Sequence, residues 1–137
     1  MNRIDFQEIS QLRLQEARVL FAAGMPGGAY YLAGYAVECA LKACIAKRTR
    51  EHDFPNKGLA QESYTHDLKE LVRVALLKYE LNSALKANSQ MVSYWEIVRG
   101  WSEESRYARK TIEEAQSLLQ AIEDQEGGML PWVQKHW

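Results

Sequence analysis

The sequence is poor in residues that fix a fold by covalent or backbone constraint. Its 137 residues include two cysteines and three prolines. Cys39 and Cys44 lie five residues apart in one apolar segment, so on a helix they face different sides and cannot form a disulfide with each other. Two reduced thiols are typical of a cytoplasmic protein, and we expect that location.

Strand-like alternation, internal repeats and low-complexity segments are also absent from the sequence. Proline and glycine gather at a few breaks, and the segments between them have helical periodicity. The N-terminus MNRIDFQEIS has no signal-peptide pattern, and no apolar run is suited to span a membrane. We therefore predict an all-α fold, an up-and-down bundle of about five helices in residues 1–125, with a tail or short sixth helix at 126–137.

A strong charge of either sign is lacking too. The formal net charge is −1, so binding to nucleic acid would require a local cluster of basic residues. No glycine-rich segment carries the lysine and hydroxyl of a P-loop, and cysteines within an apolar helix do not fit a reactive thiolate. The sequence predicts no cofactor.

The most apolar segment, Gly27–Arg48, is predicted to form the central helix. A helix that is apolar on nearly all sides has to be surrounded by neighbours. Glu38 and Lys42 are its charged residues between Ala29 and Ala46, and they form a favourable i,i+4 pair. The polar strip that contains this pair either forms a network in the core or lines a cleft.

Further helices are predicted around this one. The first has an apolar arc that includes Leu12 and Val19. Arg13 falls inside this arc, where it either pairs with Glu16 or reaches Glu38. The predicted segments are a helix at about 2–23, a loop at 49–65, a helix that begins at 65–67, a helix at 79–101, a charged bend at 102–107 and a helix at 108–125.

Two His-Asp pairs, His52-Asp53 and His66-Asp67, contain side chains that bind divalent ions. Their order does not match the separated His, His-Asp, Asp pattern of helical metal phosphohydrolases. Thr65 and Asp67 are instead suited to cap the N-terminus of a helix. We predict no metal site.

A cluster of arginines, acids and aromatic residues follows the predicted helix at 79–101. It consists of Arg99, Trp101, Glu103, Glu104, Arg106, Tyr107 and Arg109. Arginines beside aromatic rings bind phosphate and stack on bases, although a solvated helix end has the same composition. Trp132 and Trp137 lie in a tail too short to bury both rings by itself, which favours an oligomer interface.

These segments, in this order, resemble the stand-alone prokaryotic branch of HEPN-domain proteins. The resemblance covers roughly residues 5–125 and rests on AVECALKA at Ala36–Ala43, on THDL at Thr65–Leu68 and on Arg106-Tyr107. It implies a helical bundle that dimerises. Many members are metal-independent RNases of toxin–antitoxin or defence systems, and others are partners of minimal nucleotidyltransferases.

The RNase members carry an arginine followed by four to six residues and a histidine, which moves a proton while the arginine holds the phosphate. In this chain Arg99 is followed at such a spacing by Arg106, which cannot exchange its proton near neutral pH. Only three residues separate Arg48 from His52. The family's hydrolytic mechanism is therefore not expected here.

The resemblance and the residues together predict a homodimeric HEPN-type module that binds a nucleotide, RNA or a nucleotidyltransferase-type partner. The predicted ligand-binding residues are Arg99, Glu103, Arg106 and Tyr107, with Glu38 and Lys42 lining or supporting the cleft. One alternative is a divergent metal-independent RNase of the toxin or defence type, with His52 or His66 as its base. The other is an assembly protein without a ligand.

Overall fold

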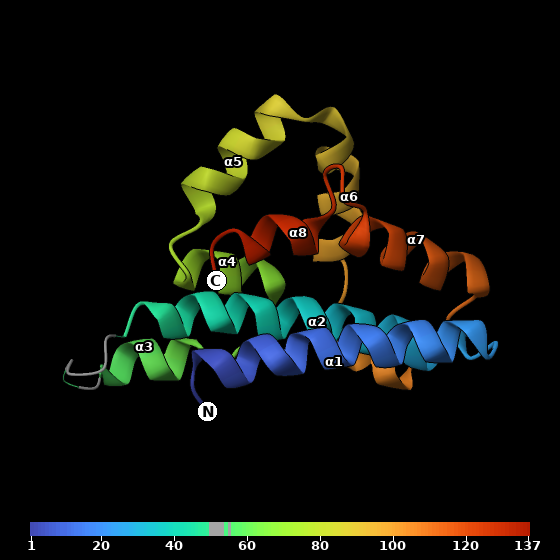
Figure 1. The fold of residues 1–137 in the computed structure, drawn as a ribbon, viewed down its shortest axis with the longest axis horizontal. Helices are drawn as coiled ribbons and strands as arrows, with labels where there is room; N and C mark the ends of the chain where they lie inside the picture. Colours follow the sequence, from blue (N-terminus) through green and yellow to red (C-terminus); the bar gives the residue numbers. More distant parts are fainter. Residues whose placement is uncertain (50–53, 55) are drawn as a thin grey trace.

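A computed structural model describes residues 1–49, 54 and 56–137, and the secondary structure in these residues is entirely helical. The all-α prediction is confirmed (Figure 1). The helices are α1 (Arg3–Ala22), α2 (Pro26–Lys47), α3 (Lys57–Glu62), α4 (Leu68–Val74), α5 (Lys78–Ala87), α6 (Ser89–Arg99), the 3-10 helix η1 (Glu103–Tyr107), α7 (Ile112–Glu123) and α8 (Met129–Gln134).

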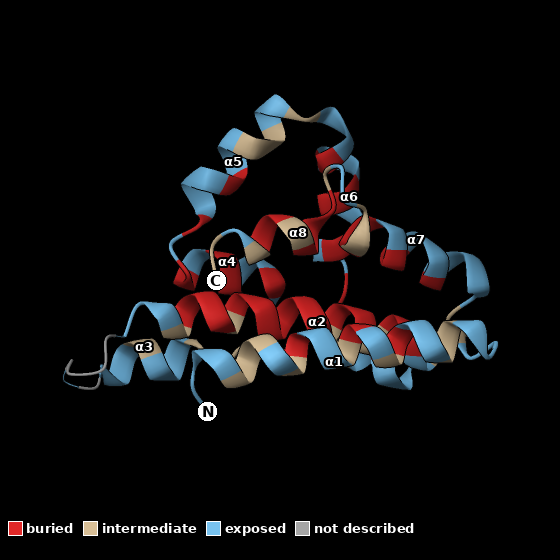
Figure 2. Cartoon of the chain, in the orientation of Figure 1, coloured by how far each residue is buried: buried red, intermediate tan, exposed pale blue. Residues whose placement is uncertain are grey.

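Helix α2 is the centre of the fold, as its apolar sequence predicts. It packs along α1 and also contacts α4, α7, α8 and η1, so it is buried over most of its length (Figures 1 and 2). Pro26 stands at the start of the helix, where its missing N–H and fixed φ are tolerated. Small residues such as Ala33, Ala36 and Ala40 are completely buried and let the neighbouring helices come close.

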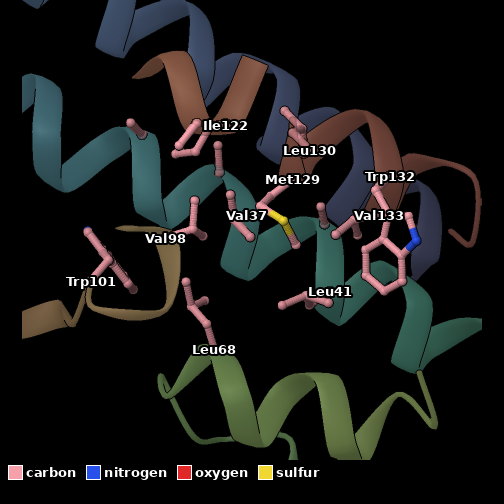
Figure 3. Packing of buried hydrophobic residues seen from close by; sticks show 14 of the residues in the cluster. Val37, Leu41, Leu68, Val98, Trp101, Ile122, Met129, Leu130, Trp132 and Val133 are labelled. Atoms are coloured by element: carbon pink, nitrogen blue, oxygen red, sulfur yellow. The ribbon is translucent and has the colours of Figure 1, made fainter. Parts of the chain in front are cut away.

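The core joins α2 to four other parts of the chain (Figure 3). Leu41 of α2 and Leu68 of α4 are both fully buried, and each such side chain contributes about 1.5–3 kcal/mol through removal of its apolar surface from water. The other labelled core residues are Val37, Val98, Trp101, Ile122, Met129, Leu130, Trp132 and Val133. This core holds α4 and the end of α6 against the same helix.

The predicted helix at 79–101 is two helices, α5 and α6, which meet at Asn88. The Asn88 side chain accepts a hydrogen bond from the Met91 amide at 3.2 Å and so caps α6. Apolar residues on both sides of Asn88 made the two helices look continuous in the sequence. As a result, α5 turns away from the rest of the bundle (Figure 1).

Two other predicted helix boundaries are also changed by a side chain that caps a helix. The segment 49–65, predicted as a loop, contains α3, and the Asn56 side chain caps this helix by accepting a bond from the Leu59 amide at 3.1 Å. The helix predicted at 108–125 begins at Ile112, because Thr111 and Glu114 form a capping box there. Local hydrogen bonds from side chains thus set the helix ends.

The interior position predicted for part of α1 is wrong. Leu12 and Val19 are exposed, with 48% and 63% of their surface accessible. Arg13 pairs with Glu16 at 2.6 Å, and this decides between its two predicted partners. The face of α1 that packs on α2 is marked instead by Leu14 and by small residues that are better suited to close helix packing.

The C-terminal segment packs onto the bundle through α8. Trp132 is 9% exposed and belongs to the core, and Trp137 packs against it with part of its surface buried. The segment does not bury both rings by itself: the bundle covers Trp132, while Trp137 stays only partly buried. The exposed position expected for Trp132 is therefore wrong, because α8 packs on α2 and α7. Within the part of the chain that is described, no helix combines the length and the apolar character needed to cross a membrane.

Candidate functional site

An open polar pocket lies between the start of α4 and the segment that joins α6 to η1. We call it the α4–η1 pocket. Its lining residues are Thr65, His66, Asp67, Lys69, Arg99, Gly100, Trp101, Ser102, Glu103 and Glu104. The pocket therefore brings together two polar segments, 65–69 and 99–104, that lie far apart in the sequence.

Both walls of the pocket are held by local structure. On one side Asp67 caps α4, since its Oδ1 accepts hydrogen bonds from the amides of Lys69 at 2.9 Å and Glu70 at 3.4 Å. This confirms the predicted capping role. On the other side the Trp101 ring is 2% exposed and stacks on Tyr31, with 6.1 Å between the ring centroids.

Gly34 of α2 makes the position of Trp101 possible. A Cβ atom at Gly34 would lie 2.3 Å from three carbons of the indole ring, closer than any real contact. The glycine thus lets the ring lie directly on the backbone of α2, and the ring in turn fixes the chain just before Glu103.

His66 is the central side chain of the pocket, because both of its ring nitrogens face carboxylates. Nδ1 lies 2.7 Å from Oε1 of Glu38, and Nε2 lies 3.1 Å from Oε2 of Glu103. A carboxylate only accepts hydrogen bonds, and a neutral imidazole has only one N–H to donate. The doubly protonated ring is therefore the form that satisfies both contacts.

Glu38 lies behind His66, inside the protein. It is 1% exposed, and its Oε1 also meets Nζ of Lys42 at 3.0 Å. Its other oxygen, Oε2, is buried and lacks a hydrogen-bond partner among the described residues. A buried carboxylate needs compensating charge. The polar strip of α2 is thus a core network that reaches the pocket through His66.

The predicted site residues fall into three groups. Arg99 and Glu103 line the pocket, while Glu38 and Lys42 support His66 from below. Arg106 and Tyr107 lie at the end of η1 and are not among the lining residues. The Arg106 guanidinium sits 5.0 Å from the centroid of the Tyr107 ring, and that ring is 79% exposed. His52 lies outside the described residues.

Thr65 and Lys69 line the pocket but were not among the predicted ligand-binding residues. His66 was predicted only as an alternative base. The THDL segment was the one sequence feature that pointed to His66, because it places a histidine beside a helix cap. The contact of His66 with Glu38 spans 28 residues, so no local sequence pattern could predict it.

The two cysteines do not contribute to the pocket. Both are buried free thiols, and burial raises the pKa of Cys39 to about 12 and that of Cys44 to about 11. This burial is what their position in an apolar helix predicts. A thiolate nucleophile would require the opposite shift.

The fold and the pocket define a small helical-bundle protein with a polar site at the side of its central helix. A family model of the HEPN domain matches residues 5–126. The chain therefore belongs to the HEPN family, and the resemblance seen in its sequence is confirmed. Comparisons with curated proteins and with solved structures give no match.

Proposed function

We propose that this HEPN module binds the phosphate group of a nucleotide or of RNA in the α4–η1 pocket. The observation that carries the proposal is the shared position of His66 and Arg99 in that pocket. A protonated imidazole and a guanidinium are both donors suited to phosphate oxygens. Lys69 adds a third basic side chain to the same lining.

Two of the three acidic residues of the pocket are already engaged by other groups, while Glu104 is exposed to solvent. Asp67 is engaged with the backbone amides of α4, and Glu103 is engaged with His66. Arg99 is 43% exposed and pairs at 3.3 Å with Glu96, one turn back along α6. Exposed pairs of this kind contribute about 0–1 kcal/mol, so a phosphate can replace Glu96 at little cost.

Arg106 and Tyr107 have a separate role in the proposal. The exposed Tyr107 ring, with the Arg106 guanidinium over it, offers a face on which a base can stack. Tyr107 ends the same short helix η1 that Glu103 begins, so in this proposal a ligand with its phosphate at His66 places its base on that ring. A nucleotide or an RNA end has both of the required groups.

A second candidate function is metal-independent RNA cleavage, favoured by the contact between Glu38 and His66. A buried carboxylate at Nδ1 orients a histidine for proton transfer at Nε2. This reaction requires the neutral ring of His66, with Nδ1–H donated to Glu38 and Nε2 unprotonated and released from Glu103. Nε2 then takes the proton of the ribose 2′-hydroxyl, whose oxygen attacks the phosphorus. The bond from phosphorus to the 5′-oxygen breaks, and that oxygen takes up a proton from water, which leaves a 2′,3′-cyclic phosphate and a 5′-hydroxyl.

We also propose that the chain forms a homodimer. Ile4, Leu12 and Val19 are exposed by 48% or more, and at about 100° per residue they fall within roughly 80° of the circumference of α1. Exposed apolar side chains grouped in this way support a contact with a second copy or with a nucleotidyltransferase-type partner. Leu12→Glu should shift the sedimentation coefficient to that of a monomer.

The binding proposal is tested by thermal unfolding at fixed protein concentration with a panel of nucleotides and short RNAs. A ligand at about 100 times its Kd adds about 2.7 kcal/mol of stability, which raises Tm visibly. His66→Asn and Arg99→Ala should abolish the rise. Arg18→Ala is the matched control, because it also removes an exposed, paired arginine, but from a different surface, between α1 and α7, that shares no residue with the pocket.

Absence of a shift with every ligand, in a protein that is folded, would overturn the binding proposal. Cleavage is tested separately by incubating labelled RNA with the protein in the presence of a chelator. The second candidate requires cyclic-phosphate products that disappear in His66→Asn. Binding without such products would leave only the first function.

A further inference from the structure

We infer that Nε2 of His66 is the anion subsite of the α4–η1 pocket, and that the Glu103 carboxylate holds this subsite until a phosphate displaces it. The inference rests on the proposed function and assigns Glu103 a role opposite to that of a direct ligand-binding residue. The Glu103 carboxylate is itself an anion at 3.1 Å from Nε2, in the place that a phosphate oxygen would take.

The two carboxylates on His66 differ in how they can be replaced. Glu38 is 1% exposed and shares its Oε1 with Lys42, so a ligand from solvent cannot reach it. The Glu103 side chain is 40% exposed and lies on the pocket side of the ring. Displacement of Glu103 therefore exposes one N–H of His66 while Glu38 keeps the ring in position.

Only the side chain of Glu103 has to move. The backbone on either side is anchored, since Trp101 is 2% exposed and Ser105 is 7% exposed. Glu103 is the first residue of η1, and this short helix packs on α2. A rotation about the side-chain bonds of Glu103 is sufficient to open the subsite without a change in the fold.

Charge balance gives the exchange its selectivity. Glu38 and Lys42 offset each other, and the proton on Nε2 offsets Glu103. A neutral ligand is a poorer replacement for Glu103, because it would leave the N–H at Nε2 without an anionic acceptor. A phosphate restores the balance and gains Arg99, which lines the same pocket.

Glu104 provides a matched control. It is adjacent to Glu103, lines the same pocket and is exposed, but it forms no ion pair with any residue that the structure describes. Glu103→Gln and Glu104→Gln therefore make the same change in net charge at neighbouring positions. Only the first removes an anion from His66.

The experiment is a titration of the three proteins with inorganic phosphate at constant ionic strength, followed by the imidazole nitrogen resonances of His66. We expect Glu103→Gln to bind phosphate about fivefold more tightly than the native chain, a change of the size of one exposed ion pair. Glu104→Gln should change the affinity by less than about twofold. His66→Asn lacks the ring, so its phosphate binding is followed by the shift in Tm; there the added Glu103→Gln substitution should give no gain, as a double-mutant cycle requires.

An equal gain in phosphate affinity in the two glutamine variants would show that only net charge matters, which would overturn the inference. Phosphate binding in the pocket would still stand. Weaker binding in Glu103→Gln would also overturn it and return Glu103 to the ligand-binding residues. If no protein in the series binds phosphate, the proposed function fails together with the subsite. The spectra without phosphate test the contact alone: the Nε2 resonance must move in Glu103→Gln and stay in Glu104→Gln.

Discussion

Glu38 and His66 are separated by 28 residues and meet at 2.7 Å between Oε1 and Nδ1. The first residue belongs to the interior of α2, and the second precedes α4 and opens onto solvent. This contact joins the core of the bundle to its polar pocket, so a change at Glu38 acts both on stability and on the orientation of His66.

Glu38→Gln should lower the free energy of unfolding by about 2 kcal/mol. The substitution keeps the shape of the side chain but weakens two charge-assisted hydrogen bonds, and such bonds contribute about 1.5–3 kcal/mol. Urea unfolding measures the change. Glu16→Gln is the control, because the Glu16 side chain that pairs with Arg13 is 38% exposed. This substitution should lower the free energy of unfolding by less than about 1 kcal/mol. Equal losses in the two variants would contradict a special role for the buried carboxylate.

Gly34→Ala should destabilise the protein by about 1–3 kcal/mol, the range for overpacking a core. Alanine favours a helix by up to about 1 kcal/mol over glycine, but a contact of 2.3 Å with the buried Trp101 ring outweighs that gain. Thermal unfolding gives the size, and near-ultraviolet circular dichroism detects the displaced indole. Gly58→Ala, exposed and with 3.4 Å to its nearest atom, should be close to neutral or stabilising. A native-like spectrum and Tm for Gly34→Ala would show that the ring can move freely.

Acid should weaken the fold partly through Asp124. The Tyr94 hydroxyl donates a hydrogen bond to Asp124 at 2.5 Å and lowers the pKa of that carboxyl. The native state thus binds fewer protons than the unfolded chain, so this contribution is complete above the ordinary value of 3.8 and is lost as the pH falls through the lowered pKa. Tyr94→Phe should make the decline shallower in urea titrations across this range. Tyr79→Phe is the control: Tyr79 is 80% exposed, so this variant should show the same dependence of stability on pH as the native chain. The same dependence in Tyr94→Phe would contradict a contribution from the hydrogen bond to Asp124.

Cys39 and Cys44 should not react with a thiol reagent in the native protein. Burial both blocks access and raises the pKa of each thiol, so little thiolate is present near neutral pH. Addition of denaturant should release two reactive groups per chain, counted by absorbance with an aromatic disulfide reagent. Fast reaction of either cysteine without denaturant would contradict the burial of that side chain.

The main features of the fold could be predicted because they depend on local sequence patterns. The apolar run of α2 and the break at its start both indicate a helix that others surround. The division at Asn88 was not predicted, since an asparagine in a helical pattern becomes a cap only when the chain turns there. Tertiary packing also decided that Leu12 is exposed and that Trp132 is buried.

The pocket was predictable only in part. Arg99 and Glu103 stand close together in the sequence, and their grouping with aromatic residues pointed to this region. The position of His66 depends on how α4 packs on α2, a long-range relationship that no periodicity expresses. The same relationship makes Glu38 a core residue and connects it to the pocket through one ring.

The arrangement of the bundle around α2 also determines how it opens. Because α1, α4, α7, α8 and η1 all pack on this helix, its amides can exchange hydrogen with solvent only when the whole core separates. Helix α5 has its main packing contact with α6 and turns away from the centre (Figure 1). We therefore expect α5 to unfold at a lower free energy than α2, so that its amides exchange faster while the pocket and the core beneath it stay intact.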